Sequence, residues 1–172
     1  MIVKYENALS EENCGRLIAL FEAASDLHER YEGSMPQWTE LNLTQHRDRW
    51  SDLFDSLTRL YSNTFVQYIQ ETEAMCPRPS LLEEFRLKRY EGSDRFDLHT
   101  DVVNHDTARR YLVGMLYLNN PVGGEIEFPQ HGLTIEPTAG DFVVFPCNWC
   151  YPHIAHPTTT IKYAISSYAH YD

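Results

Sequence analysis

The chain has 172 residues, of which 42% are hydrophobic, 23% charged and 13% aromatic. This size and composition predict one folded domain and exclude a disordered or fibrous protein. The 25 acidic and 14 basic side chains give a net charge of -11. We therefore expect no binding to nucleic acid and none to an anionic membrane.

No apolar run approaches the roughly 18 residues that a membrane-spanning helix requires. The first residues contain no apolar segment typical of a secretory signal. The four cysteines lack the spacing of a disulfide framework; they are Cys14, Cys76, Cys147 and Cys150. Together these features predict a cytoplasmic protein with reduced thiols.

The first third of the chain is predicted to be helical. Ser10 is the expected N-cap of a first helix, in which apolar residues recur at helical spacing. A second helix is expected over residues 50–73, with Asp48 as its N-cap. Its wide apolar stripe is expected to pack against one face of a sheet and includes Leu53, Leu57, Leu60 and Phe65. Residues 28–49 show no periodicity and are predicted to form a long loop between the helices.

From residue 81 the hydrophobic period changes to two, which is typical of strands. Residues 84–90 alternate in this way, and later strands are expected over residues 111–118, 125–128, 133–136, 141–145 and 160–169. Many short strands separated by turns predict a sandwich or barrel, and the preceding helices make the fold class α+β. We place no domain boundary. Helical support is expected over residues 1–79 and the strand-rich core over residues 80–172.

Lys162 is the only lysine or arginine from Tyr111 to the last residue. It lies within an apolar predicted strand, where a buried cation normally has an anionic partner. On that strand it shares a face with Ala164 and Ser166, whose small side chains leave room for a ligand. The alternative is a lysine that extends from a sheet edge into solvent.

His99-Thr100-Asp101 lies at the end of a predicted strand, where residues two apart point to the same face. A histidine and a carboxylate on one face could supply two ligands of the facial triad found in non-haem Fe(II) sites. Two other His-x-Asp pairs are less well placed. His46 and Asp48 lie in the predicted loop, and His170 lies at the C-terminus.

A third metal ligand should be a histidine on a distant strand. His153 fits this requirement, and His156 is a close alternative. A rival interpretation is a zinc site made of Cys147, Cys150, His153 and His156. Only two residues separate its two pairs, where about twelve are usual, so a tetrahedral site would be hard to close. We expect the two cysteines to pack as small hydrophobic residues.

Seven short motifs follow one another in order between residues 81 and 171. They are Tyr90-x-Gly92, His99-x-Asp101, Tyr117-Leu118-Asn119, Gly123-Gly124-Glu125, Gly140-Asp141, His153-x3-Pro157 and Lys162-Tyr163. This order resembles the prolyl 4-hydroxylase branch of the 2-oxoglutarate and Fe(II)-dependent dioxygenases. The resemblance implies a double-stranded β-helix, or jelly-roll barrel, supported by N-terminal helices.

The resemblance also implies roles for individual residues. His99, Asp101 and His153 would hold Fe(II), and Lys162 would bind the far carboxylate of 2-oxoglutarate. The phenols of Tyr90 and Tyr117 would donate hydrogen bonds to 2-oxoglutarate, although either residue could simply pack. Arg110 corresponds to a substrate-contacting arginine of a related enzyme, and its alternative is a solvated strand end.

The activity implied by the resemblance is hydroxylation of an unactivated C–H bond. Its cofactors would be Fe(II), 2-oxoglutarate and O2, with ascorbate as an optional addition, and its substrate a prolyl residue of a peptide or protein. One alternative is a hydroxylase of a free amino acid or another small molecule. Another is a non-catalytic, cupin-like metal-binding jelly roll.

Overall fold

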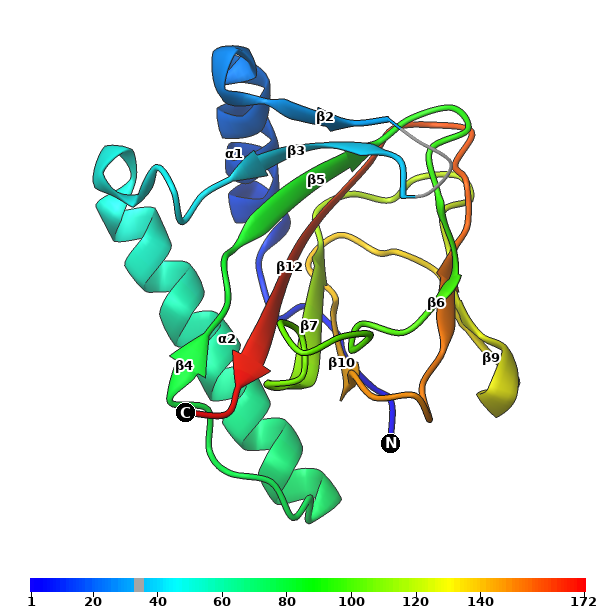
Figure 1. Ribbon diagram of the computed structural model, residues 1–172. Coiled ribbons are helices and arrows are strands. Elements are labelled where there is room, and N and C mark those ends of the chain that lie inside the picture. Colours follow the sequence, from blue (N-terminus) through cyan, green and yellow to red (C-terminus); the bar gives the residue numbers. More distant parts are fainter. Residues whose placement is uncertain (33–35) are drawn as a thin grey trace.

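The computed structural model describes residues 1–32 and 36–172. Two α-helices lie in the N-terminal half, and a series of strands makes up the C-terminal half (Figure 1). The helices are α1 (Glu11–Ala23) and α2 (Ser51–Thr72), with short 3-10 turns η1 (Ser25–Leu27), η2 (Arg47–Arg49) and η3 (Pro129–His131). The strands are β1 (Val3–Tyr5), β2 (Glu29–Tyr31), β3 (Trp38–Asn42), β4 (Leu81–Leu82), β5 (Arg86–Tyr90), β6 (Phe96–His99), β7 (Arg110–Tyr117), β8 (Ile126–Phe128), β9 (Leu133–Ile135), β10 (Phe142–Pro146), β11 (His153–Ala155) and β12 (Lys162–His170).

The strands form two antiparallel sheets that face each other. The larger sheet has the order β1-β10-β7-β12-β5-β3-β2, with β4 paired to β12, and the smaller sheet has the order β6-β11-β8-β9. Figure 1 shows the two sheets enclosing a common interior, with the smaller sheet on the side away from the helices. This architecture is a jelly-roll double-stranded β-helix and confirms the fold predicted from the sequence.

The helices cover the outer face of the larger sheet (Figure 1). Ser10 caps α1 as predicted, because its side chain accepts a hydrogen bond from the Asn13 amide at 3.4 Å. On α2, the hydroxyl of the fully buried Tyr61 donates to the Ile165 carbonyl of β12 at 2.8 Å. The sheet therefore has a dry apolar layer on one side, which leaves its other face free to line the barrel.

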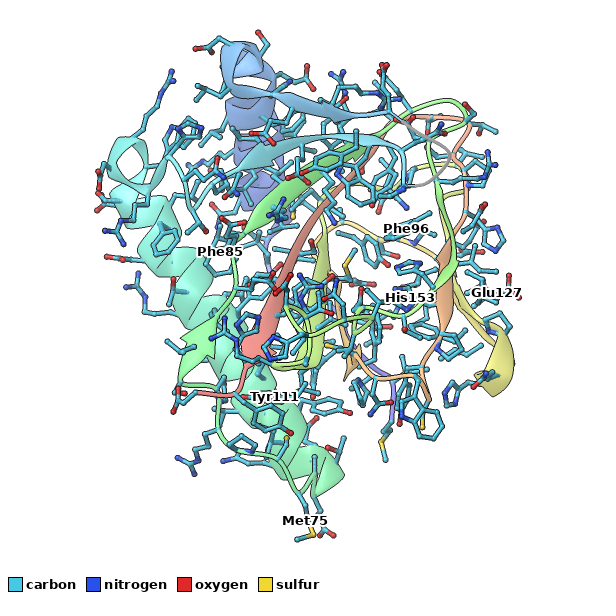
Figure 2. All side chains as sticks on the ribbon, in the orientation of Figure 1. Met75, Phe85, Phe96, Tyr111, Glu127 and His153 are labelled. Carbon is cyan, nitrogen blue, oxygen red and sulfur yellow. The ribbon has the colours of Figure 1, made fainter. Side chains whose placement is uncertain are left out.

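Two clusters of buried side chains divide the core. One lies between the helices and the larger sheet and includes Phe85, and the other lies between the two sheets and includes Phe145. In Figure 2, Phe85 lies on the side of α2, whereas Phe96 and His153 lie in the space between the sheets. The interior between the sheets is thus lined by both apolar and titratable groups.

The prediction of a long loop over residues 28–49 is wrong. This segment contains β2 and β3, which extend the larger sheet beyond β5, while residues 33–35 lie outside the described residues. All five residues of β3 are buried, and the inward-facing ones include the polar Glu40 and Asn42. A strand that is buried on both faces and carries polar groups shows no apolar alternation, so the sequence pattern hides it.

Asp48 is not the N-cap of α2, contrary to the sequence prediction. It lies in the turn η2, and its side chain is fully exposed. The N-cap position is held by Trp50, which makes no side-chain capping hydrogen bond. The extra 3-10 turn before the helix displaces Asp48 from the first exposed amides of α2.

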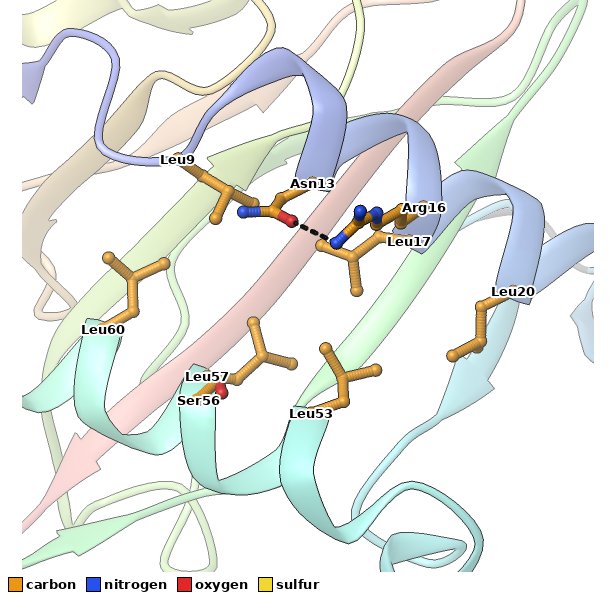
Figure 3. A pocket seen from close by; sticks show the side chains of 9 residues that line it. All are labelled: Leu9, Asn13, Arg16, Leu17, Leu20, Leu53, Ser56, Leu57 and Leu60. Atoms are coloured by element: carbon orange, nitrogen blue, oxygen red, sulfur yellow. Dashed lines mark hydrogen bonds between the residues drawn. The ribbon is translucent and has the colours of Figure 1, made fainter.

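A groove of about 400 Å³ separates α1 from α2 on the outer surface (Figure 3). Leu53, Leu57 and Leu60 all line this groove. Leu53 and Leu60 are only half-buried, whereas Leu57 and Phe65 are buried. Some side chains of the predicted apolar stripe of α2 therefore pack on the sheet, and others face α1 across the groove. Within residues 1–32 and 36–172, no helix has both the length and the apolar character needed to cross a membrane.

Candidate active site

Three of the predicted residues meet inside the barrel. His99 ends β6, Asp101 follows it by two residues, and His153 begins β11, directly opposite His99 in the antiparallel β6–β11 pair. One ligand atom from each residue lies within 4.8 Å of the other two. The strand pairing therefore joins two parts of the chain that are 54 residues apart into one metal-binding cluster.

The hydrogen bonds of this cluster orient its nitrogen atoms. Nδ1 of His99 lies 2.7 Å from the carbonyl oxygen of Asp97, and Nδ1 of His153 lies 3.2 Å from that of Tyr151. We assign a proton to each Nδ1, which donates to the carbonyl and leaves the lone pair of Nε2 free. The two Nε2 atoms face Asp101, at 3.8 Å from Oδ1 and 3.9 Å from Oδ2.

The charge state of the cluster suits a divalent cation. Burial, together with the neighbouring His153, lowers the pKa of His99 to about 4, so this imidazole is neutral at pH 7. Asp101 accepts a hydrogen bond from the hydroxyl of Tyr168 at Oδ1, at 3.0 Å, but its buried Oδ2 has no hydrogen-bond partner. A buried carboxylate oxygen without a partner is costly. Fe(II), which binds two histidines and one carboxylate, fits this donor set.

The alternative ligands lie elsewhere. Nε2 of His156 is 2.6 Å from a carboxylate oxygen of Glu127, and Figure 2 shows Glu127 at the outer side of the smaller sheet. Cys147 is buried among apolar side chains between the sheets. In the described part of the chain, His99, Asp101 and His153 form the only group of three or more metal-capable side chains. The rival zinc cluster is not assembled.

Lys162 lies deep in the barrel, as the sequence argument requires. It begins β12 opposite Tyr90, with 3% of its surface exposed, and burial lowers its pKa to about 8. Its ammonium donates a hydrogen bond to the Gly124 carbonyl at 2.8 Å and lies 4.3 Å from the centre of the Tyr90 ring. No carboxylate of the described residues forms an ion pair with it.

Tyr90 and Tyr117 flank Lys162 on the inner face of the larger sheet. Tyr90 pairs with Lys162 across β5 and β12, and Tyr117 pairs with Ala164 across β7 and β12. Both rings are buried, and burial raises the pKa of each phenol, so both remain protonated donors. Neither hydroxyl makes a hydrogen bond to another described residue. A phenol donor on each side of a buried cation is an arrangement suited to a carboxylate ligand.

Arg110 is not a solvated strand end. Its guanidinium binds both carboxylate oxygens of Glu83, at 2.5 and 2.6 Å, and donates to the Asp101 carbonyl at 3.0 Å. It also lies 4.0 Å from the centre of the Tyr168 ring. Arg110 therefore supports the loop that carries Asp101, and it also borders the groove that leads to the metal-binding cluster.

A groove of about 450 Å³ leads from the surface to the metal-binding cluster. His99, Asp101, Trp38 and Lys88 are among its lining residues. The sequence alone assigns no role to Trp38 or Lys88. The alternation of residues 84–90 groups Lys88 with Tyr90 on one face, but only the pairing of β5 with β3 and β12 shows that this face lines the barrel.

Two histidines and one carboxylate inside a jelly-roll barrel define the class of non-haem Fe(II) oxygenases. Residues 85–170 match the family model of the 2OG-Fe(II) oxygenase superfamily. The chain belongs to this superfamily, as the sequence predicts, and is a 2-oxoglutarate- and Fe(II)-dependent dioxygenase. Among curated proteins, none matches the sequence.

Solved structures of prolyl hydroxylases share this fold. The viral collagen prolyl hydroxylase of Paramecium Bursaria Chlorella virus-1, in its 2OG complex, is 18% identical with a TM-score of 0.72, over 97% of this chain and 94% of that chain. A prolyl-4-hydroxylase of Pseudomonas putida is 17% identical with a TM-score of 0.72, over 99% and 92% of the two chains. A Trichoplax adhaerens prolyl hydroxylase in complex with a hypoxia inducible factor peptide fragment is 16% identical with a TM-score of 0.70, over 98% and 83%.

Proposed function

We propose that this oxygenase hydroxylates a prolyl residue of a peptide or protein. The observation that carries the proposal is the pairing of a His99–Asp101–His153 cluster with a buried, carboxylate-free Lys162 in the same barrel. The first feature suits Fe(II), and the second suits the distal carboxylate of 2-oxoglutarate. The prolyl substrate is supported by the shared fold with three prolyl hydroxylases.

In this proposal, each residue has a defined task. His99 and His153 present Nε2, and Asp101 presents the unpartnered Oδ2, to Fe(II). Tyr168 holds the other oxygen of Asp101 and so fixes the carboxylate. Lys162 binds the distal carboxylate of 2-oxoglutarate, with hydrogen bonds from Tyr90 and Tyr117. When bound, Fe(II) and 2-oxoglutarate supply the activation of O2 for insertion into a C–H bond.

The groove beside the cluster is the proposed path for the substrate. It opens to solvent and ends at His99 and Asp101, so a side chain that enters it would reach the metal. The peptide held by the Trichoplax relative supports a peptide substrate for this chain. Arg110, which borders the same groove, is the proposed contact to the substrate backbone.

We include a cytoplasmic location and a single catalytic domain in the proposal. The four cysteines are free thiols, and Cys14 and Cys147 are buried, which is the usual state of cysteines in a reducing compartment. The helices of residues 1–79 and the barrel share one apolar layer, which supports their acting as one unit.

The test is mass spectrometry of proline-containing peptide libraries incubated with the enzyme, Fe(II), 2-oxoglutarate, O2 and ascorbate. The expected result is addition of one oxygen atom to proline, with one succinate formed for each hydroxylation. The matched control is His153→Ala, which should give neither product. Oxygen addition to other residues only, or to free amino acids only, would contradict the prolyl-peptide assignment.

A further inference from the structure

Lys88 is a second buried cation in the barrel. It lies in the middle of β5, opposite Glu40 of β3 and Ala164 of β12, with 8% of its surface exposed. Its ammonium lies 4.1 Å from the centre of the Trp38 ring. Its side chain borders both the cavity between the sheets and the groove that leads to the metal-binding cluster.

The carboxylate nearest to Lys88 in the strand pairing is already occupied. Glu40 accepts a hydrogen bond from the Trp38 indole at 2.8 Å on one oxygen. Its other oxygen accepts hydrogen bonds from Arg86 at 2.5 Å and from the Tyr31 hydroxyl at 3.4 Å. Glu40 is thus committed to its own partners and forms no ion pair with Lys88.

The other cations that border the groove are also paired. Arg86 binds Glu40 and Glu84, and Arg110 binds Glu83. Of the three groove cations, and within residues 1–32 and 36–172, only Lys88 has neither a hydrogen bond nor an ion pair. Burying an ammonium without a carboxylate in direct contact is costly, so a ligand carboxylate in the groove would stabilise Lys88.

The cosubstrate does not supply this anion. The charges of Fe(II), Asp101, the 2-oxoglutarate dianion and Lys162 cancel one another. Glu40 attracts the Lys88 ammonium through its charge but makes no ion pair with it, so no carboxylate of the described residues contacts Lys88 directly. Lys162 does not border the groove, whereas Lys88 does. The two lysines also lie at successive inward positions of the sheet, about 7 Å apart along the strands, with Lys88 on the side of the groove.

We propose that Lys88 binds a carboxylate of the substrate and so selects acidic substrates. The inference rests on the proposed function and deepens it by naming the substrate class. Two sources offer the same chemistry: the α-carboxylate of a free proline or C-terminal proline, and the side chain of an Asp or Glu next to an internal proline. The Trp38 ring lies beneath the ammonium, and Lys88 borders the groove through which such a ligand would enter.

The test measures binding to enzyme loaded with Mn(II) and 2-oxoglutarate without oxygen, so that no turnover occurs. The probes are matched pairs: L-proline with L-prolinamide, N-acetyl-glycyl-proline with its amide, and capped tripeptides with Asp or Asn, or Glu or Gln, on either side of proline. Dissociation constants are determined by calorimetry for wild type, Lys88→Met and Lys88→Arg. The pair that shows the preference identifies the source of the carboxylate.

We expect at least one carboxylate probe to bind wild type about 30-fold or more tightly than its amide. Lys88→Met should abolish this preference without changing the affinity for the amide, and Lys88→Arg should retain it. Lys88→Met should also melt at the same or a higher temperature, because it removes an unpaired buried charge and keeps the apolar stem.

Three results would overturn the inference: no carboxylate preference in any pair, a preference that survives in Lys88→Met, or a loss of 2-oxoglutarate affinity in Lys88→Met as large as in Lys162→Met. The last result would assign Lys88 to the cosubstrate. Failure of wild type to bind 2-oxoglutarate in the presence of Mn(II) would instead contradict the proposed function itself.

Discussion

Lys162 packs closely against Gly124, and the two residues are joined by a hydrogen bond. The Gly124 backbone has a φ of +78°, and a Cβ at this position would lie 3.0 Å from Cδ of Lys162. Glycine therefore allows both the positive φ and the passage of the lysine stem. The carbonyl of the same glycine accepts the hydrogen bond from the ammonium. Gly124 of the Gly-Gly-Glu motif thus fixes where the Lys162 ammonium lies, and this ammonium is the proposed binding group for 2-oxoglutarate.

Replacing this cation gives the first prediction. Lys162→Met should weaken 2-oxoglutarate binding by about 2–5 kcal/mol, because one side of a buried charge pair is removed. Lys162→Arg should retain part of the affinity, since it keeps the charge with a different geometry. The measurement is a 2-oxoglutarate titration with Mn(II) in the absence of oxygen. Metal affinity serves as the control and should not change; wild-type affinity in Lys162→Met would place the cosubstrate elsewhere.

The two neighbouring histidines offer a matched test of the metal site. His153→Ala should lower Fe(II) affinity by about 100-fold or more, because it removes one of three ligands. His156→Ala should leave the affinity near wild type, because His156 is bound to Glu127 away from the cluster. Anaerobic Fe(II) titration of the two variants and the wild type measures both effects. Equal losses of Fe(II) affinity in the two variants would contradict the assignment of His153 as a metal ligand.

At the scale of elements, α2 is the main cover of the larger sheet. The rings of Tyr61 and Phe65 pack against Phe142 of β10, and Phe65 also lies beside Gly114 of β7. Tyr61 donates a hydrogen bond to the β12 backbone. Because the apolar stripe is wider than the contact with the sheet, its edge turns toward α1 and lines the groove between the helices. The leucines of α2 therefore differ in how deeply they are buried.

Two leucines of α2 show this difference. Leu57→Ala should lower the free energy of unfolding by about 3 kcal/mol, because it removes a side chain that is almost fully buried. Both leucines line the groove between the helices, but Leu53→Ala should cost only about 1 kcal/mol, because Leu53 is half-buried and loses less apolar contact. Urea unfolding of both variants gives the comparison. A larger loss for Leu53→Ala would mean that the helix presents another face to the sheet.

At the scale of the whole molecule, the N-terminal half does more than support the barrel. It supplies β1, β2 and β3 to the larger sheet in addition to the two helices. Removing residues 1–75 would expose the apolar face of the sheet and leave two strand edges unpaired. We expect the fragment 76–172 to be unfolded by circular dichroism and unable to bind metal. A folded, metal-binding fragment would show that the barrel is independent of this half.

The ion pair between Arg30 and Asp94 connects the N-terminal strand β2 to the barrel and makes stability depend on pH. Arg30 of β2 binds both oxygens of Asp94, at 2.7 Å each, in the loop between β5 and β6. Burial alone would raise the pKa of Asp94, but the hydrogen bonds from Arg30 hold it below the ordinary value of 3.8. A lowered pKa in the folded state stabilises the protein above the unfolded pKa, and this contribution is lost as the pH falls through the folded value.

Asp94→Asn should therefore lower the free energy of unfolding by about 1–2 kcal/mol at pH 7, a value reduced by the partial exposure of Arg30. The difference from wild type should persist down to about pH 5 and shrink as the pH falls below the ordinary aspartate pKa. Urea unfolding of both proteins across this range is the measurement. A difference that grows toward low pH would contradict the assigned direction of the pKa shift.

The sequence by itself determined the family, the fold class and three residues that meet at the metal-binding cluster. These features depend on local pattern and spacing: helical periodicity in α1 and α2, alternation in the strands, and the two-residue spacing of His99 and Asp101 at the end of β6. The lone lysine in an apolar strand also pointed to a buried site, because the cost of burying a charge is the same in any fold.

Only the tertiary structure decided which side chains complete that site. Paired residues of β3 and β5 are at least 44 positions apart in the sequence, and the polar inward face of β3 gives no apolar pattern. Neither the strand nor the hydrogen-bond partners of Glu40 could therefore be predicted. Among the described residues, Lys88 has no ion pair because Glu40 is already bound by Trp38 and Arg86. Pairing between distant segments decides such contacts, since the energy of a buried charge depends on every group packed around it.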